Sequence, residues 1–141
     1  MRRQEKYPDT TTFHFYNANP HNRITTDCVI RAISTASGVA YNDVVMDLAK
    51  IQCKTGFDPS EASTFGKYLE SLGFEKRRQP RKSDGTKYTG KEFCELLQRG
   101  DGKKDRIVAN IGGHHAVAIV NGKVYDTWNS TKGCIGNYWI K

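Results

Sequence analysis

The chain has 141 residues, a formal net charge of +7 at pH 7, and an ordinary share of hydrophobic residues, 37%. This length suits one domain with its own core and leaves little room for two. No apolar segment approaches the roughly 18 residues that a membrane-spanning helix needs, and the basic start lacks the apolar stretch of a secretory signal. We therefore expect a single domain over residues 1–141, in the cytoplasm.

Helices are predicted for the first two-thirds of the chain. Capping residues, apolar spacing and glycine stops indicate a short strand at 11–16 and four helices, at 28–37, from Asn42 to Ile51, after residue 60 to Gly73, and from Thr89 to Leu97. The helix at 28–37 has apolar side chains at i, i+3, i+4 and i+7, with Thr26 or Asp27 as the N-cap and Gly38 as the stop.

Strands are predicted for the last third. Residues 106–110 and 136–140 are short strand candidates, and between them lies a hairpin whose two strands are joined by Asn121 and Gly122. Asn-Gly between apolar runs is the strongest short-range hairpin signal. Helices followed by antiparallel strands are typical of the α+β class.

Pairing across this hairpin brings two polar side chains together. Val120 pairs with Lys123 and His115 with Trp128, so alternation places His115 and Asp126 on one face. They are diagonal neighbours about 7–8 Å apart at the backbone, within reach of long side chains. A carboxylate that orients an imidazole is half of a nucleophilic catalytic site.

The four cysteines include one candidate nucleophile. No Cys-x-x-Cys spacing occurs, so we expect free thiols, no metal site and no cofactor. Cys28 lies in the first turn of its predicted helix, where unpaired N–H groups and the helix dipole favour a thiolate. The others, Cys53, Cys94 and Cys134, are interpreted as small packed hydrophobes.

Three segments resemble a papain-like cysteine peptidase of the compact bacterial, phage or Josephin type. They are DCVIRAI (27–33), GHHAVAI (113–119) and VYDTW (124–128). The resemblance implies an α+β papain-like fold, in which a central helix carrying the nucleophile packs on a C-terminal antiparallel sheet. It also implies that Cys28 is the nucleophile, His115 the general base and acid, and Asp126 the residue that orients His115.

The chain departs from this family in one element. The family's oxyanion donor is a glutamine several residues before the cysteine, and no glutamine stands there. Asn22, six residues upstream of Cys28, is the nearest side-chain amide. Asn129 is an alternative third member of the triad, although strand alternation places it on the opposite face from His115.

Much of the positive charge lies in residues 75–88, which we interpret as a flexible loop or a lid. A charge run of this kind is usually a solvated loop, and otherwise binds an anionic partner such as nucleic acid or an acidic protein. Its basic side chains are Lys76, Arg77, Arg78, Arg81, Lys82 and Lys87, and the first five are the candidate contacts to that partner.

The sequence supports three hypotheses about function. The first is a thiol hydrolase, a cysteine protease or amidohydrolase, that cleaves a peptide, isopeptide or amide bond in a protein or peptide through an acyl-enzyme, with acyl transfer to an amine as a variant. The second is a papain-like module with weak or no catalysis that binds an anionic partner through 76–91. The third, a nucleic-acid-binding protein in which the cysteine and histidine are core residues, has the least support.

Overall fold

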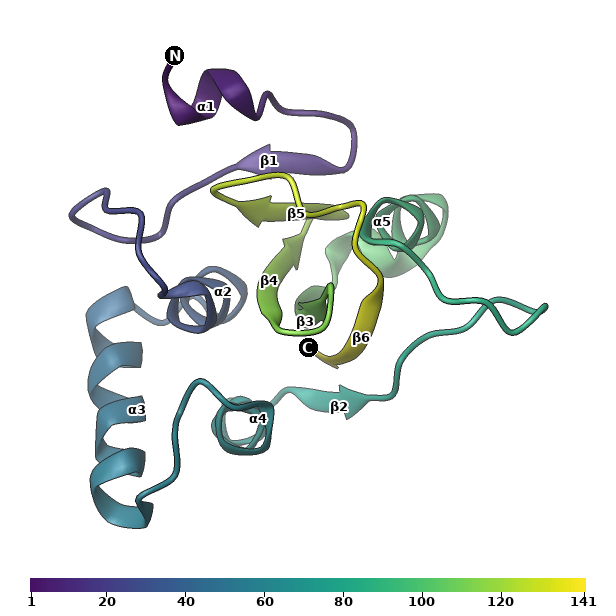
Figure 1. Ribbon diagram of the computed structural model, residues 1–141. Helices are drawn as coiled ribbons and strands as arrows, with labels where there is room; N and C mark the ends of the chain where they lie inside the picture. Colours follow the sequence, from purple (N-terminus) through teal and green to yellow (C-terminus); the bar gives the residue numbers. More distant parts are fainter.

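The computed structural model describes residues Met1–Lys141 and confirms the α+β class. The longest helix, α3, has 15 residues, and none of the helices combines the length and hydrophobicity needed to cross a membrane. In chain order (Figure 1) the elements are α1 (Arg3–Lys6), β1 (Phe13–Phe15), α2 (Cys28–Ser37), α3 (Tyr41–Thr55), α4 (Ala62–Ser71), β2 (Glu75–Arg77), α5 (Gly90–Arg99), a 3-10 turn (Asp101–Lys104), β3 (Arg106–Ile111), β4 (His115–Val120), β5 (Lys123–Asp126) and β6 (Ile135–Ile140).

All six strands form one sheet in the order β1-β5-β4-β3-β6-β2. The strands of the C-terminal third pair antiparallel, as expected, whereas β1 pairs with β5 in parallel. The N-terminal two-thirds of the chain therefore supplies both edges of the sheet, β1 on one side and β2 on the other. Periodicity does not predict such pairings, because they join segments far apart in the sequence.

Helices cover both faces of the sheet. On one face, α2 and α4 bury apolar side chains against β3, β4 and β6, including Val108, Ala118 and Trp139. On the other face, α5 packs Phe93 against a second cluster that includes Val117. Figure 1 shows α2, α3 and α4 on one side of the strands and α5 on the other. Alternate residues of the central strand β4 thus enter opposite cores, as a period of two requires.

The helix ends follow the predicted capping signals with two corrections. Thr89 caps α5 in a reciprocal capping box with Glu92, and Gly38 ends α2 in the left-handed conformation at φ 79°. The helix expected from Asn42 begins one residue earlier, at Tyr41. Asp27 occupies the N-cap position of α2, but its side chain makes no capping hydrogen bond.

The hairpin between β4 and β5 forms as predicted. Asn121 and Gly122 both have positive φ, 55° and 69°, which is the geometry of a type I′ turn. Val120 pairs with Lys123, and the register continues to Ala118 and Tyr125. The turn therefore fixes which residues of the two strands lie together where the hairpin opens.

Residues 75–88, expected as a flexible loop or lid, are hydrogen-bonded to the rest of the protein. Residues 75–77 form strand β2, which pairs with β6. Further along, Arg81 and Lys87 form a β-bridge, and the Gln79 side chain donates to the Ile135 carbonyl at 2.9 Å. The segment between β2 and α5, residues 78–89, extends away from α2 and from the end of β5 (Figure 1).

Candidate active site

Three element ends bring the predicted catalytic residues together. Cys28 is the first residue of α2, His115 the first of β4, and Asp126 the last of β5. Because α2 packs along β4, the start of the helix meets the open end of the hairpin (Figure 1). Cys28 thus comes from a separate part of the chain and lies near His115 and Asp126, which the register of the hairpin places side by side.

His115 lies between the other two side chains. Its Nε2 is 2.5 Å from Oδ2 of Asp126, whose side chain is only 1% exposed. The Cys28 thiol lies close enough to the imidazole for each group to shift the pKa of the other. Since Nε2 is engaged by the carboxylate, Nδ1 is the nitrogen that remains for the thiol. The arrangement is a Cys–His–Asp chain of side chains.

The surroundings of Cys28 favour its thiolate. Burial raises the pKa of the Cys28 thiol, but hydrogen bonds from His115 and the Ala116 backbone, with the positive charges of His115 and Arg31, lower it further than burial raises it. The net pKa is below that of an ordinary thiol. The start of α2 adds the positive end of a helix dipole.

The same contacts keep His115 protonated at neutral pH. Burial lowers the pKa of the imidazole, but the hydrogen bonds to Asp126 and Cys28 outweigh burial and raise it to about 9. For Asp126, burial raises the pKa, and the bonds from His115 and Arg31 reverse that effect and lower it. The site therefore favours a thiolate–imidazolium pair beside an ionised carboxylate.

A buried arginine lies behind this pair. Arg31 Nη1 donates to Oδ1 of Asp126 at 2.8 Å, and Arg31 Nε donates to Oδ1 of Asp27 at 2.8 Å. Asp27 in turn accepts hydrogen bonds from the Tyr41 hydroxyl at 2.6 Å and the Asn19 amide at 3.0 Å. Roles for Arg31, Tyr41 and Asn19 were not predicted. The signal for Arg31 in the sequence is a charged residue on an apolar helix, four positions after an aspartate.

Two other predicted site residues, Asn22 and Asn129, have hydrogen-bond partners of their own. Asn22 is exposed, has φ 54°, and its side-chain oxygen accepts a hydrogen bond from Asn17. Asn129, the alternative third triad member, accepts hydrogen bonds from the backbone and hydroxyl of Thr131, at 3.1 and 2.6 Å. Neither side chain has a hydrogen bond to Cys28 or His115 in the structure.

The backbone at the start of α2 supplies an N–H donor at the nucleophile itself. The Cys28 N–H opens the helix and makes no backbone hydrogen bond, as is usual for the first N–H groups of a helix. An N–H next to the nucleophile is in the right place to stabilise an oxyanion. Beside the pair, the Trp128 ring packs on the His115 ring with centroids 5.0 Å apart and covers one of its sides.

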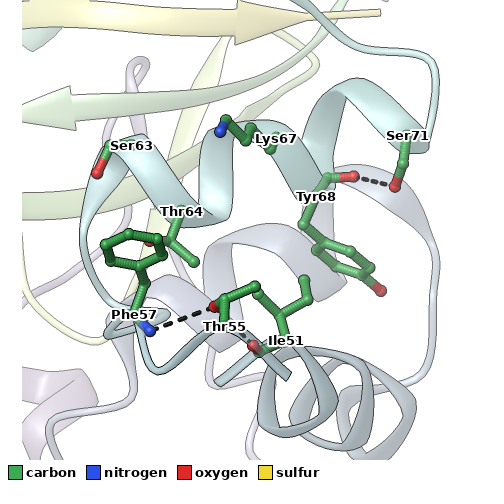
Figure 2. Close-up of a pocket in the computed structure, with 8 residues that line it drawn as sticks. All are labelled: Ile51, Thr55, Phe57, Ser63, Thr64, Lys67, Tyr68 and Ser71. Atoms are coloured by element: carbon green, nitrogen blue, oxygen red, sulfur yellow. Dashed lines mark hydrogen bonds between the residues drawn. The ribbon is translucent and has the colours of Figure 1, made fainter. Parts of the chain in front are cut away.

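Two cavities near the start of α2 share Val29 and Ser60 in their walls, and Cys28 and His115 line neither of them. One, of about 340 Å³, lies between α2, the start of α4 and the turn before His115; the other, of about 220 Å³, lies between α2 and α3. A larger pocket of about 510 Å³ between α3 and α4 (Figure 2) has Phe57, Lys67 and Tyr68 in its wall and no nucleophile beside a base.

Of the three cysteines expected to be packed thiols, Cys94 is packed and Cys53 and Cys134 are not. Cys94 is buried, and burial raises its pKa to about 12. Cys53 and Cys134 are exposed, because each lies on an outward-facing position that periodicity did not resolve. No cluster of three or more His, Cys, Asp or Glu side chains in the structure is arranged to hold a metal ion.

Comparison with known proteins gave no relative. No protein-family model matches the chain, and no curated protein or solved structure matches it significantly. Inference about function therefore rests on the geometry of the chain itself.

Proposed function

We propose that this protein is a papain-like thiol hydrolase that cleaves a peptide, isopeptide or amide bond through an acyl-enzyme on Cys28. One observation carries the proposal: the His115 imidazole lies between the Cys28 thiol and the buried Asp126 carboxylate. A cysteine, a base within hydrogen-bond reach and a third group that orients the base form an activated nucleophile. We place the activity in the cytoplasm, where free thiols stay reduced.

The order and context of the three residues support the papain-like assignment. The nucleophile opens a helix that packs against an antiparallel pair of strands, the histidine opens one strand, and the aspartate ends the next. This is the arrangement that the resemblance of residues 27–33 and 113–128 implies. Because one fold serves many activities, the proposed function depends on the residues of the site and not on the fold.

In the acylation step, the Cys28 thiolate attacks the carbonyl carbon of the substrate. Its sulfur forms a bond to that carbon while the carbonyl π electrons move to oxygen, which the Cys28 N–H is placed to stabilise. The His115 imidazolium then donates its Nδ1 proton to the leaving amine as the C–N bond breaks. A thioester on Cys28 and a neutral imidazole remain.

Deacylation reverses these roles. Neutral His115 takes a proton from a water molecule, whose oxygen attacks the thioester, and the C–S bond breaks to restore the thiolate. An amine in place of water gives acyl transfer with the same residues. Asp126 stays ionised throughout and holds the ring by its bond to Nε2.

The acyl-enzyme is the testable intermediate. We expect p-nitrophenyl acetate to acetylate Cys28 and release a burst of p-nitrophenol equal to one acetyl group per chain, with the modified residue located by peptide mass spectrometry. The Cys28→Ala variant is expected to lose the burst. Adding a primary amine to the wild type measures how the acetyl group partitions between water and amine.

Exposed thiols supply the matched control. Cys53 and Cys134 are more accessible than Cys28, but Cys53 lies within α3 and Cys134 just before β6, so neither opens a helix as Cys28 does. Cys53→Ala is expected to retain the full burst. A burst that persists in Cys28→Ala, or acetylation that favours Cys53 or Cys134, contradicts the proposed function.

A groove beside β2, at one edge of the sheet, favours anion binding as a second candidate function. About 620 Å³ in volume, it has no apolar residue in its wall and is lined by Lys76, Arg78, Gln79, Arg81 and Asn137. Two neighbours are already paired, Arg77 with Glu75 and Lys82 with Glu92. Lys76, Arg78 and Arg81 are therefore the cations that remain for a phosphate-bearing or acidic ligand.

Salt dependence tests this second candidate. Affinity for a single-stranded oligonucleotide is expected to fall about tenfold or more between 50 and 200 mM salt, and further in the Lys76→Gln/Arg78→Gln variant. Fluorescence anisotropy gives both values, and Lys50→Gln/Lys54→Gln on α3 is the matched charge control. Affinity indifferent to salt and to both groove substitutions removes this candidate.

A further inference from the structure

Arg31 is a buried cation between two buried carboxylates. Its side chain is 9% exposed, against 7% for Asp27 and 1% for Asp126. Desolvation of an arginine and two aspartates is costly, and packing alone does not require it. A planar guanidinium spans two acceptors with fixed geometry, which an ammonium does not.

Every oxygen of Asp126 is held. Oδ2 accepts from Nε2 of His115, while Oδ1 accepts from Arg31 at 2.8 Å and from the Thr127 backbone N–H at 2.7 Å. The carboxylate cannot turn about its bond without breaking one of these contacts. The direction of its bond to His115 is therefore set by Arg31 and Thr127.

The other end of Arg31 is anchored just as firmly. Asp27 accepts from Arg31, from Tyr41 on α3 and from Asn19 in the loop before α2. Asp27 also directly precedes Cys28 in the chain. A single side chain thus connects the residue before the nucleophile to the residue that orients the base.

We propose that Arg31 is a positioning residue of the candidate active site: by bridging Asp27 and Asp126, it fixes the start of α2 relative to the hairpin and so keeps His115 aimed at the Cys28 thiol. Arg31 does not contact the substrate, and it acts through Asp126. This inference rests on the proposed function, because it explains how that site is held.

Charged and polar groups from several elements surround Arg31 and Asp126. Asp27 precedes α2, Arg31 lies within it, and Asp126 ends β5. Tyr41 of α3 reaches Asp27, and Arg3 of α1 donates through Nε to the Thr127 carbonyl at 2.6 Å. Removing Arg31 alone both loosens Asp126 and deletes a positive charge, so the test must separate these two effects.

The pH dependence of Cys28 alkylation by iodoacetamide provides that separation. Arg31→Met is expected to move the acid limb of the profile up by about one pH unit, which is about tenfold slower reaction at pH 6. The Asp27→Asn/Arg31→Met double variant removes one charge of each sign and leaves no unpaired carboxylate at position 27. If positioning is the role, its acid limb rises by a similar amount although the net charge is unchanged.

The matched control is Arg23→Met, which deletes one positive charge from an exposed side chain in the loop before α2. Its profile is expected to coincide with the wild type, and thermal unfolding shows that each variant is folded when it is alkylated. A folded double variant with a wild-type acid limb overturns the role of Arg31 and leaves the proposed function intact. A wild-type acid limb at the ordinary thiol pKa, about 8.5, overturns both.

Discussion

Replacing His115 by alanine is expected to slow iodoacetamide alkylation of Cys28 at pH 6 by about 100-fold or more. Only the thiolate reacts, and below the pKa its fraction falls tenfold for each unit by which the pKa rises. His115→Ala removes the hydrogen bond and the charge that lower the pKa of Cys28 and leaves burial, which raises it. Without His115, burial raises the pKa of the thiol unopposed by the imidazole, and the tenfold loss of thiolate per unit makes the effect large.

His114 is the matched control for this prediction. It neighbours His115 in the chain, but it is exposed and lies in the turn before β4. His114→Ala is expected to leave the alkylation profile unchanged, and Cys134 in the same sample reports any general change in reactivity. Equal effects of the two histidine substitutions, or no effect of either, would remove His115 from the site.

The high pKa of His115 also predicts an alkaline limit on amide cleavage. The imidazolium must donate a proton to the leaving amine, and it loses that proton as the pH rises through about 9. Acylation by an amide substrate is therefore expected to fall above pH 9. Alkylation by iodoacetamide, which needs no proton donor, is expected to continue at its plateau over the same range.

The second large effect is on stability. Trp139→Ala is expected to lower the free energy of unfolding by about 3–5 kcal/mol, the usual cost of deleting a buried aromatic side chain. Trp139 is 1% exposed and packs against Phe65, with ring centroids 5.2 Å apart. A Cβ on Gly66 would lie 2.7 Å from the Trp139 ring, so α4 already approaches the sheet as closely as glycine permits.

Urea denaturation followed by circular dichroism measures this loss. Trp139→Phe is the comparison variant. The Trp139 Nε1–H has no hydrogen-bond partner in the structure, so this substitution removes no hydrogen bond. It is expected to cost clearly less than Trp139→Ala. Trp128→Ala, which changes the half-buried ring over His115, supplies the contrast at the other tryptophan. A Trp139→Ala variant as stable as the wild type is incompatible with the described packing of α4 on β6.

Part of the candidate site is local in sequence, and that part was predicted. The pairing of Val120 with Lys123 follows from two left-handed turn residues, and the register then brings His115 near Asp126. The choice of Cys28 followed from its place at a helix start. Each of these inferences needs only the geometry of one element or one turn.

The loop before α2 and the basic segment at 75–88 show what such local reasoning leaves out. Asn22, chosen as the nearest side-chain amide before Cys28, is exposed, whereas the amide of Asn19 is the one that hydrogen-bonds to Asp27. Positive charge alone suggested a flexible loop at 75–88, whereas backbone pairing with β6 decided its structure. Loop paths and edge pairings depend on partners that lie far away in the chain.

The sequence by itself determined the α+β class, the helix that begins at Cys28 and the hairpin that joins His115 to Asp126, because periodicity, capping and turn chemistry act over a few residues. The tertiary structure alone decided that α2 packs along β4, that β1 joins β5, and that Arg31, already bonded to Asp27, reaches Asp126, 95 residues further along the chain. Burying Arg31 is favourable only once both carboxylates are in place, and long-range packing is what brings them there.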